Sequence, residues 1–589
     1  MFDGMYSIRT HVNDQVTADL VGREVTLAGW VGKRRDHGGL IFVDLRDRSA
    51  IVQVTFNPDH AGEAFKIAEQ IRPEWVVAVT GTVRLRPEGT VNEGMITGQV
   101  EVVVSSIEVL NSSKTPPFEI EEGIDTDELT RMKWRYLDIR RPEVARALVL
   151  RDKVTQTFRS ALAQRGFLEV ETPILNKSTP EGARDFIVPS RLNAGKFYAL
   201  PQSPQLFKQL LMVGGIERYY QIARCFRDED LRADRQPEFT QVDIEMSFVK
   251  MDDILKMMED VMSDVMASAG HEFVTPLRRM TWHDAMNDYG SDRPDIRFGL
   301  NLVDVSDIVK ECGFKVFSGS VAGGGVVKAI NAKGAGDFSR SKIDAFNKLA
   351  LDSGAKGLAW IAFPSTGEVK SPIAKFFTEE EITDLRQATD VEVGDLLVFI
   401  ADEINVANEV LGIIRLRLAD ELGIERAGHA PLWVVDFPMF LPDKETGGWT
   451  ATHHAFTLPH EKYLDTLESN PGDVLSYSYD LVMNGLEIGG GTLRIHNQEL
   501  QMRVLKVIGL KEEEAADQFG FLLEALSFGA PPHGGIALGL DRLIMVLAGA
   551  DSIRDVIAFP KTSSGGDPMS SSPSNVTPRQ LKEAHIRID

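Results

Sequence analysis

The chain has 589 residues, of which 43% are hydrophobic and 26% are charged, and its formal net charge is -23. This length is too great for one ordinary hydrophobic core and predicts several domains. The acidic balance argues against a general nucleic-acid coat protein, although one local basic patch would be enough to bind a nucleic acid.

The sequence also restricts the cellular location. The first residues contain no apolar segment typical of a signal peptide, and no apolar run is long enough to cross a bilayer. The two cysteines, Cys225 and Cys312, are too few and too far apart for a disulfide framework or a cysteine-rich zinc site. We therefore expect a cytoplasmic protein with no membrane contact.

Residues 1–111 contain five short β-prone runs, with one helical run between the third and the fourth. This order predicts an OB-type barrel, a fold that often binds oligonucleotides. The basic segment 33–39 lies between the first two runs, and Phe42 and Gln53 lie on the next two. A stacking ring, an amide and arginines suit single-stranded RNA, although each residue alone could also be a core or solvated turn residue.

Residues 112–295 begin with a predicted linker, 112–140, because Pro116 and Pro117 disfavour a helix. A long amphipathic helix should follow from Pro142 and end at Gly166. A strand closed by Pro173 comes next, and Ser203 opens another helix as its N-cap. The long helix and the strand after it could also be ordinary core elements that contact no partner protein.

Residues 218–249 contain two β-prone runs separated by a long charged loop. The second run alternates between apolar and polar residues, which predicts a half-buried strand. The polar side carries Gln241, Asp243 and Glu245. Loops of this length are usually functional or disordered, and a solvated hairpin tip is the simpler interpretation.

Residues 296–427 show βαβ-like runs, and Gly323–Gly325 lacks the spacing of a dinucleotide-binding loop. In 428–562, the strand-like segment 449–457 carries His453 and His454. Neighbouring residues of a strand point in opposite directions, so we expect one core and one site histidine. The tail, 563–589, is rich in Ser, Gly and Pro and then polar.

Three segments together resemble the class II aminoacyl-tRNA synthetases in their aspartate-type form. FRDE with RQPEFTQVDIE resembles motif 2, the helix and strand from Pro142 to Pro173 resemble motif 1, and GGIALGLDRL resembles motif 3. The segment between motifs 2 and 3 resembles an insertion found in bacterial members. A match of three motifs in the right order is far more specific than any one of them.

The resemblance implies a multidomain α+β chain with an antiparallel catalytic sheet. The expected parts are an OB-fold anticodon-binding domain (1–111), a hinge or linker (112–140), a first catalytic part (141–295), an inserted α/β domain (296–427), a second catalytic part (428–562) and a tail (563–589).

The resemblance also assigns substrates and site residues. The family activates L-aspartate with ATP and transfers it to tRNA(Asp), so ATP, L-aspartate and tRNA are the expected ligands, with Mg2+ as the metal. The catalytic residues implied are Arg227, Glu229 and Arg542. The aspartate-binding residues implied are Glu181, Ser203, Gln205, Lys208, Arg227, Asp243, His453 and Arg494. The ATP-binding residues implied are Arg227, Glu229, Gln236, Phe239, Glu487, Gly539, Leu540, Asp541 and Arg542.

Two further groups of residues follow from the same resemblance. Asp480 and Glu487 would hold Mg2+, a hard ion that prefers oxygen ligands and substrate phosphates. Arg35, His37, Phe42 and Gln53 would contact the anticodon. His37 stands where family members that charge only tRNA(Asp) commonly have leucine, so the chain is similar to the non-discriminating group, which also charges tRNA(Asn). A solvent-exposed turn histidine is the alternative.

The resemblance further implies a homodimer and, for a tRNA(Asn)-charging enzyme, a downstream tRNA-dependent amidotransferase. The alternatives are a strictly discriminating enzyme, lysyl or asparaginyl enzymes, an amide-forming paralogue and a non-catalytic tRNA-binding paralogue. Lys208 and Arg494 argue against the lysyl enzyme, and Lys208 against the asparaginyl enzyme. The segment 1–111 argues against the amide-forming paralogue. The non-catalytic paralogue should have lost Arg227, Glu229 or Arg542, and all three are present.

Overall fold

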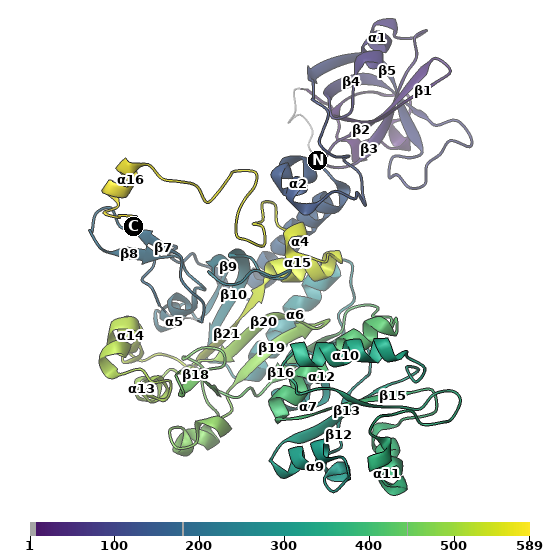
Figure 1. The fold of residues 1–589 in the computed structure, drawn as a ribbon. Helices are drawn as coiled ribbons and strands as arrows, with labels where there is room; N and C mark the ends of the chain where they lie inside the picture. Colours follow the sequence, from purple (N-terminus) through teal and green to yellow (C-terminus); the bar gives the residue numbers. More distant parts are fainter. Residues whose placement is uncertain (1–7, 180–181, 444–445, 589) are drawn as a thin grey trace. The chain divides into compact units, whose positions relative to one another are not determined.

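The computed structural model describes residues 8–179, 182–443 and 446–588, which form two compact units (Figure 1). One unit comprises Met1–Leu148, Ala558–Thr562 and Gly566–Pro573, and the other comprises Val149–Ile557, Ser563–Gly565 and Ser574–Asp589. The chain passes from the first unit to the second within helix α4 (Pro142–Gln164), which ends two residues before Gly166, as predicted.

The first unit contains a closed five-stranded barrel with the strand order β1-β2-β3-β5-β4. Alternate residues of its strands, such as Leu27, Val54 and Val102, fill the interior. Helix α1 (Gly62–Gln70) connects β3 to β4. These features confirm the predicted OB fold. The strands are β1 (Glu24–His37), β2 (Leu40–Arg46), β3 (Ile51–Phe56), β4 (Val76–Leu85) and β5 (Val100–Asn111).

The segment 112–140, which we predicted to be a linker, carries helices α2 (Glu128–Lys133) and α3 (Arg135–Asp138). The Asp138 carboxylate is fully buried and accepts hydrogen bonds from Arg135 Nη1 at 2.5 Å and Arg141 Nη1 at 3.0 Å. A buried carboxylate requires such partners. The segment is therefore folded around an ion cluster that its composition does not reveal.

An eight-stranded sheet with the order β11-β16-β19-β20-β21-β10-β9-β6 lies at the centre of the second unit. Its inner pairings are antiparallel, and the outermost pairing at each edge is parallel. This confirms the predicted catalytic sheet. The strands are β6 (Leu168–Glu169), β9 (Arg218–Phe226), β10 (Glu238–Ser247), β11 (Arg278–Thr281), β16 (Pro431–Val435), β19 (Ser478–Met483), β20 (Leu486–Leu493) and β21 (His533–Gly539).

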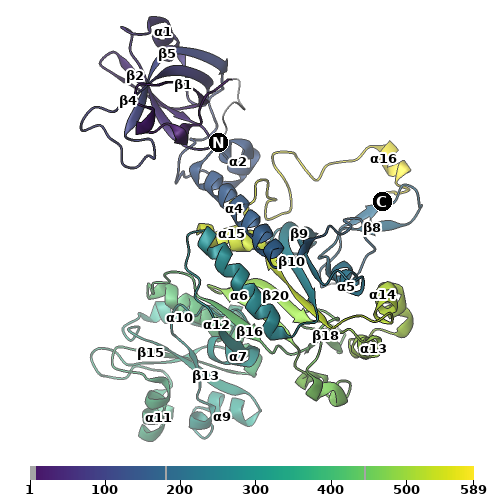
Figure 2. The ribbon, with the colours of Figure 1, turned by 180° about the vertical axis from the view of Figure 1, so that it is seen from behind.

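Helices and two small hairpins complete this unit, and α6 lies across one face of the sheet (Figure 2). The helices are α5 (Gln205–Val213), α6 (Met251–Ser268), α7 (Trp282–Tyr289), α13 (Gln498–Val507), α14 (Glu512–Leu526), α15 (Leu540–Ala548) and α16 (Pro578–Glu583). The hairpins are β7 (Ile187–Pro189) with β8 (Phe197–Ala199), and β17 (Phe440–Pro442) with β18 (Trp449–Ala451).

Strand β10 is buried on both faces, so the prediction of a half-buried strand is wrong. It pairs with β9 on one edge and with β21 on the other. Glu245 lies opposite Gly535 and Met246 opposite Gly534, and a side chain on Gly534 would meet Ile254 of α6. Glu245 therefore faces away from α6. The polar residues of β10 are therefore enclosed within the protein. Alternation of polar and apolar residues in a sequence does not show whether the polar face meets water or other polar side chains.

The inserted segment forms a four-stranded sheet with the order β12-β13-β15-β14. Every pairing in it is antiparallel, so our interpretation of βαβ-like runs is wrong. One core packs it against α10 and α12, and the other against α8, α9 and α11. The elements are β12 (Leu302–Asp304), β13 (Val326–Ala332), β14 (Ala359–Ala362), β15 (Leu396–Asp402), α8 (Ser306–Val309), α9 (Lys315–Ala322), α10 (Arg340–Asp352), α11 (Glu379–Thr389) and α12 (Ile404–Glu421).

Two further observations concern the helices and the cysteines. Among the described residues, none of the helices combines the length and apolar character needed to span a membrane. Cys225 and Cys312 are both buried, and no disulfide joins them.

Candidate active site

A cavity of about 510 Å3 opens on the polar side of β10 in the second unit. Helix α5, the loop between β9 and β10, strands β10, β19, β20 and β21 and the start of α15 contribute its lining. The structure therefore brings together side chains that lie more than 300 residues apart in sequence. The predicted residues that line it are Ser203, Gln205, Lys208, Arg227, Glu229, Gln236, Phe239, Asp243, His453, Asp480, Glu487, Arg494, Gly539, Asp541 and Arg542.

One end of this cavity holds a buried network of two cations and two carboxylates. Lys208 Nζ lies 2.7 Å from Asp243 Oδ1 and 3.4 Å from Glu245 Oε2. Arg494 donates to Glu245 through Nε at 3.0 Å and Nη2 at 3.1 Å. All four side chains are at most 2% exposed. We call these residues the buried charge network.

Burial and ion pairing act against each other on these carboxylates. Burial works to raise the pKa of Glu245, but Arg494 and Lys208 hold it below its usual value. Burial raises the pKa of Asp243 in spite of the opposing charge of Lys208. A bidentate pair with arginine is the stronger arrangement. Glu245 is therefore the fixed anion of the network, whereas Asp243 is the carboxylate most easily given a new cationic partner.

Both neighbouring histidines line the cavity, so the prediction of one core histidine is wrong. Strand β18 ends at Ala451, and the chain bends at Thr452 and His453. His453 Nε2 lies 3.1 Å from Asp480 Oδ1. His454 contacts the Arg494 guanidinium through Nε2, and burial, followed by Arg494, lowers its pKa well below 6.5. A neutral imidazole thus stands beside the arginine.

The amino end of helix α5 adds two polar groups to the same end of the cavity. Ser203 Oγ accepts a hydrogen bond from the Gln205 backbone nitrogen at 3.3 Å. The Gln205 side chain is 6% exposed, and its Nε2 has no hydrogen-bond partner among the described residues. A buried donor of this kind is costly unless a ligand accepts from it. Glu181, the other predicted residue of this end, lies outside the described residues.

The opposite end of the cavity is lined by arginines and an aromatic ring. The Arg227 guanidinium lies 5.0 Å from the centre of the Phe239 ring. Arg542 donates from Nη1 to the Glu487 backbone oxygen at 2.5 Å and from Nη2 to Asp234 Oδ2 at 3.2 Å. Planar cations beside a ring form a surface suited to an aromatic base and its phosphates.

Among the predicted ATP-binding residues, Asp541 and Glu229 are paired with other side chains of the protein, and Leu540 is buried. Asp541 accepts a hydrogen bond from the Thr240 backbone nitrogen at 2.6 Å and forms an ion pair with Arg151, although it also lines the cavity. Leu540 is buried and is not part of the cavity lining. Glu229 lies 3.3 Å from Arg235 Nη1. Asp541 therefore ties the start of α15 to β10.

The predicted metal ligands lie together on β19 and β20. A side chain at Gly490 would meet carboxylate oxygens of both Asp480 and Glu487. Burial raises the pKa of Asp480 to about 6, and the charges of Glu487 and Asp292 add to this rise. An excess of negative charge at one place favours a divalent cation, so these oxygen donors fit magnesium. No group of three or more potential ligands occurs among the described residues.

A glycine on β21 makes room for the buried charge network. A Cβ atom at Gly535 would overlap the backbone oxygen of Ile244 and the carboxylate of Glu245. Gly491 pairs with Ile536, which pairs with Ile244, so Gly491 belongs to the face of the sheet that points toward α6, where the missing Cβ leaves space for the Tyr479 ring. Bare backbone therefore lies beside the buried charge network at Gly535.

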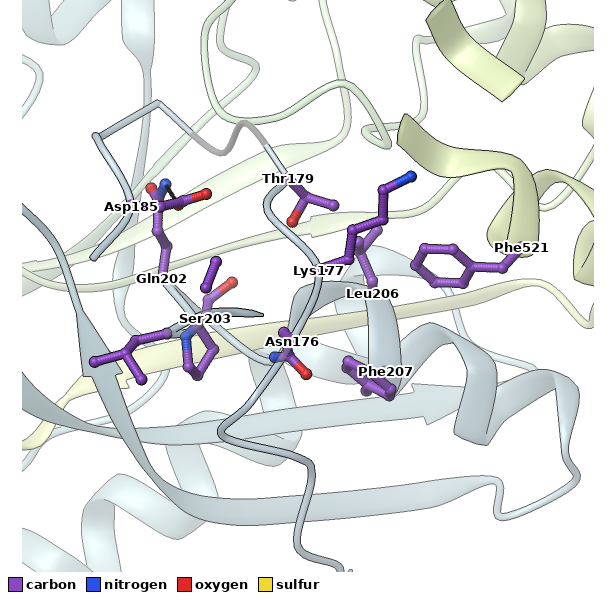
Figure 3. A pocket seen from close by; sticks show the side chains of 12 residues that line it. Asn176, Lys177, Thr179, Asp185, Gln202, Ser203, Leu206, Phe207 and Phe521 are labelled. Atoms are coloured by element: carbon purple, nitrogen blue, oxygen red, sulfur yellow. Dashed lines mark hydrogen bonds between the residues drawn. The ribbon is translucent and has the colours of Figure 1, made fainter. Parts of the chain in front are cut away.

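A smaller cavity of about 300 Å3 lies beside the first and shares Ser203 with it (Figure 3). Phe207 of α5 and Phe521 of α14 form part of its apolar lining. On its polar side, Gln202 Nε2 donates to Asp185 Oδ1 at 2.6 Å and to a backbone oxygen at 2.7 Å. These bonds anchor the segment that follows Glu181 to the residues just before α5.

In the first unit, the four predicted anticodon residues lie on neighbouring strands of the barrel. Arg35 is paired in register with Phe42, and the His37 and Phe42 rings are 6.2 Å apart. Arg35 forms a bidentate ion pair with Asp44, at 3.0 and 2.6 Å, and donates to Gln53 Oε1 at 3.3 Å. The result is a mixed aromatic and polar surface, here called the barrel face.

Sequence reasoning missed several residues of these sites. Thr492, Asp234, Arg235 and Asp292 line the main cavity, and Glu245 belongs to its buried charge network. Glu101 on β5 accepts from Gln53 Nε2 at 2.7 Å and pairs with Arg84. The polar stripe on β10 was a usable signal for Glu245. The other residues have no distinctive local pattern.

Two family models match the chain. One, described as tRNA synthetases class II (D, K and N), matches residues 127–563. The other, described as OB-fold nucleic acid binding domain, matches residues 25–110. The first match covers well over half of the chain and includes the main cavity, and the second includes the whole barrel face.

Individual proteins agree with these matches. The chain is 55% identical to the aspartate–tRNA(Asp/Asn) ligase of Heliobacterium modesticaldum, over 100% of this chain and 97% of that protein. It is 54% identical to the aspartate–tRNA ligase of Bacillus licheniformis, over 98% of each. An asparaginyl-tRNA synthetase from Pyrococcus horikoshii, solved with asparaginyl-adenylate, has a TM-score of 0.57 and 21% identity, covering 94% of this chain and 98% of that one. This last likeness concerns the fold alone.

Proposed function

The chain belongs to the class II tRNA synthetases of the aspartate, lysine and asparagine group, and from this premise we propose an aspartate–tRNA ligase that charges both tRNA(Asp) and tRNA(Asn). The enzyme activates L-aspartate with ATP to aspartyl-adenylate and pyrophosphate. It then transfers the aspartyl group to the 3′ end of tRNA. The observation that carries the aspartate specificity is the buried charge network.

The network suits aspartate because its partners can be exchanged without leaving a buried charge unpaired. In our proposal, the side-chain carboxylate of the substrate binds Lys208 and Arg494. The substrate's α-ammonium group then replaces Lys208 as a partner of Asp243, and the side-chain oxygen of Gln205 accepts a hydrogen bond from it. Asparagine would offer a neutral amide to two desolvated cations, which leaves their charge poorly compensated. The substrate of a lysyl enzyme would bring a third cation.

Activation joins two anions, because an α-carboxylate oxygen of aspartate attacks the α-phosphorus of ATP while the bond to pyrophosphate breaks. We propose that Arg227 holds the α-phosphate and the attacking carboxylate in line. Phe239 and Arg542 would enclose the adenine, with Glu229 and Gln236 fixing its edge. This reaction needs no nucleophile from the protein, so positioning and electrostatic stabilisation account for the catalysis.

Asp480 and Glu487 would hold magnesium, which neutralises phosphate charge when it is bound. His453, which lies at the end of the cavity proposed for the substrate aspartate, would hold the Asp480 carboxylate in place. In the second step, the 3′-terminal ribose hydroxyl attacks the carbonyl carbon of the adenylate and AMP leaves. Glu181 would help to enclose the amino acid during both steps, and Ser203 would support the helix that carries Gln205.

The barrel face is proposed to read the anticodon. Phe42 offers a ring for stacking, and Gln53 and Arg35 offer hydrogen-bond donors to base edges and phosphates. His37 comes directly before the turn Gly38–Gly39, in which both residues have positive φ angles. An imidazole can donate or accept a hydrogen bond, so it tolerates two different bases better than leucine would.

Three further features belong to the same proposal. Exposed apolar side chains near motif 1, including Val149, Leu168 and Leu175, support a homodimer. Aspartylated tRNA(Asn) requires a later amidation, so we expect a tRNA-dependent amidotransferase as the next enzyme. We also propose a cytoplasmic location, which suits two buried cysteines that no disulfide joins.

The decisive measurement is aminoacylation with labelled aspartate, using tRNA(Asp) and tRNA(Asn) transcripts side by side. We expect comparable charging of both and no charging with labelled asparagine. Charging of tRNA(Asp) alone would leave a strictly discriminating ligase and remove the role of His37. Charging of neither, with no aspartate-dependent ATP–pyrophosphate exchange, would indicate a non-catalytic tRNA-binding protein and overturn the site assignments.

A further inference from the structure

A contact between the barrel and the segment 112–141 involves a second ion cluster. Glu74 lies just before β4, and its side chain is 4% exposed. Its carboxylate accepts from Arg46 Nη2 at 2.8 and 2.7 Å and from Arg140 Nη1 at 2.8 Å. The Arg140 guanidinium also lies 5.0 Å from the Trp30 ring centre. We call these four residues the latch.

Three members of the latch belong to the barrel, and one does not. Trp30 on β1 and Arg46 on β2 are paired in register, so they present neighbouring side chains. Glu74 is bound to β1 through its backbone nitrogen, which donates to the Val31 oxygen at 2.7 Å. Arg140 comes from the end of the segment that folds around Asp138. The latch therefore joins the barrel to the segment 112–141.

The backbone at Glu74 supports a specific role for this position. Its φ angle is +66°, a conformation that residues other than glycine rarely adopt. Such strain persists only where the surroundings enforce it, and it is concentrated at functional positions. Here the strained backbone directs a buried carboxylate at two arginines. A second contact lies beside it, because Trp75 Nε1 donates to the Ser113 oxygen at 3.2 Å.

We propose that Arg140 and Glu74 are positioning residues that fix the orientation of the barrel on the segment from which helix α4 continues. The inference rests on the proposed role of the barrel face in anticodon binding. An unlatched barrel would populate the tRNA-competent orientation for only part of the time. The apparent affinity for tRNA is then reduced to that fraction of its full value. The rate of adenylate formation should not change, because this step needs no tRNA.

The test compares Arg140→Met with the wild-type enzyme on two substrates, full-length tRNA(Asp) and a minihelix of its acceptor stem without the anticodon arm. Arg140 lies outside the barrel, and the Arg46–Glu74 pair remains in this variant. We expect the KM for full-length tRNA to rise by about 10-fold. The minihelix kinetics, the ATP–pyrophosphate exchange and kcat should stay at wild-type values.

Three further variants make the result specific. Arg140→Lys keeps a cation near Glu74 and should recover part of the loss. Glu74→Gln should reproduce the rise in KM. Glu63→Gln, which breaks an exposed pair with Lys66 on α1, is the matched control and should change nothing.

Different results would overturn different claims. An unchanged KM for full-length tRNA in Arg140→Met, or an equal loss on the minihelix, would overturn the latch alone. A wild-type enzyme that charges the minihelix as well as full-length tRNA would overturn the proposed anticodon role and the latch with it.

Discussion

The buried charge network and the barrel face are both built from ion-paired arginines, but water reaches only one of them. In the Arg494–Glu245 pair the two side chains are 2% and 0% exposed. In the Arg35–Asp44 pair they are 35% and 19% exposed. Exposed pairs contribute little to stability, whereas breaking a buried pair leaves an uncompensated charge. The cavity should therefore reject wrong charges strongly, and the barrel face should adapt to different bases.

The largest expected effect is in the buried charge network. Replacing Arg494 by leucine leaves Glu245 without its bidentate partner, at a cost of about 3–5 kcal/mol. Aspartate-dependent ATP–pyrophosphate exchange should fall by about 1000-fold. The matched control is Arg503→Leu, which breaks a bidentate pair with Glu468 at the surface. Near-normal exchange in Arg494→Leu would contradict the claim that the buried pair matters more than the exposed one.

A stability measurement sharpens the same contrast from the carboxylate side. Glu245→Gln should lower the free energy of unfolding of the second unit by about 3 kcal/mol. Glu468→Gln, the same change in the exposed pair, should lower it by less than about 1 kcal/mol. Chemical denaturation followed by circular dichroism gives both values. Equal losses would mean that burial does not set the strength of these pairs.

The barrel face should respond through tRNA alone. Phe42→Ala removes a stacking ring and should raise the KM for tRNA(Asp) by about 10-fold. The exchange reaction should stay unchanged, because it takes place in the other unit without tRNA. A substitution of Phe65, which packs against the barrel core, serves as a control for general loss of folding. A fall in exchange with Phe42→Ala would contradict the separation of the two sites.

A smaller effect should separate the two tRNA substrates. His37→Leu is expected to reduce kcat/KM for tRNA(Asn) by about 5-fold and to leave tRNA(Asp) charging unchanged. The physical reason is the loss of a group that can both donate and accept hydrogen bonds. Parallel aminoacylation assays give both values. Equal changes for both tRNAs would return His37 to the role of a turn residue.

The smallest effect concerns pH. Burial, followed by Arg494, His453 and Lys208, lowers the pKa of His454 well below 6.5. The folded state thus binds this proton less readily than the unfolded state, so stability decreases as the pH falls through 6.5. From pH 7 to pH 6 this amounts to about 0.7 kcal/mol. His454→Gln should remove that part of the pH dependence of unfolding, and an identical profile would show that His454 titrates freely.

The sequence predicted the barrel and the long helix from short-range patterns, whereas the antiparallel catalytic sheet was predicted from the resemblance to the class II motifs. Alternation, turn residues and the helix stop at Gly166 need no knowledge of distant contacts. The prediction for β10 was wrong about exposure, because a polar stripe looks the same against water and against Lys208 and Arg494. The direction of His454 was also missed, since β18 ends earlier than the β-prone residues indicate.

The ion clusters were not predicted, and for most of them the reason is that their members lie far apart in sequence. Glu74 has the pattern of an ordinary charged residue until the fold brings Arg46 and Arg140 to it. The hydrogen-bond partners of Asp138 lie only three residues away, and there the sequence does not show that the carboxylate is buried. What is true of Glu74 is also true of Asp541, which the family motif assigns to ATP but which the structure ties to Arg151 and β10. A motif identifies which residues are present. Which of them bind a ligand and which stabilise the fold depends on how they pack.

The bare backbone under the buried charge network limits how the enzyme could be redesigned. Gly535 and Gly490 already lack a side chain, so the sheet can yield no further space to a larger amino acid. Any added atom there would collide with the neighbouring strand. A wider pocket would have to come from α5 or from the segment carrying His453 and His454. Directed evolution towards other amino acids should therefore accumulate changes on those two elements and leave β20 and β21 untouched.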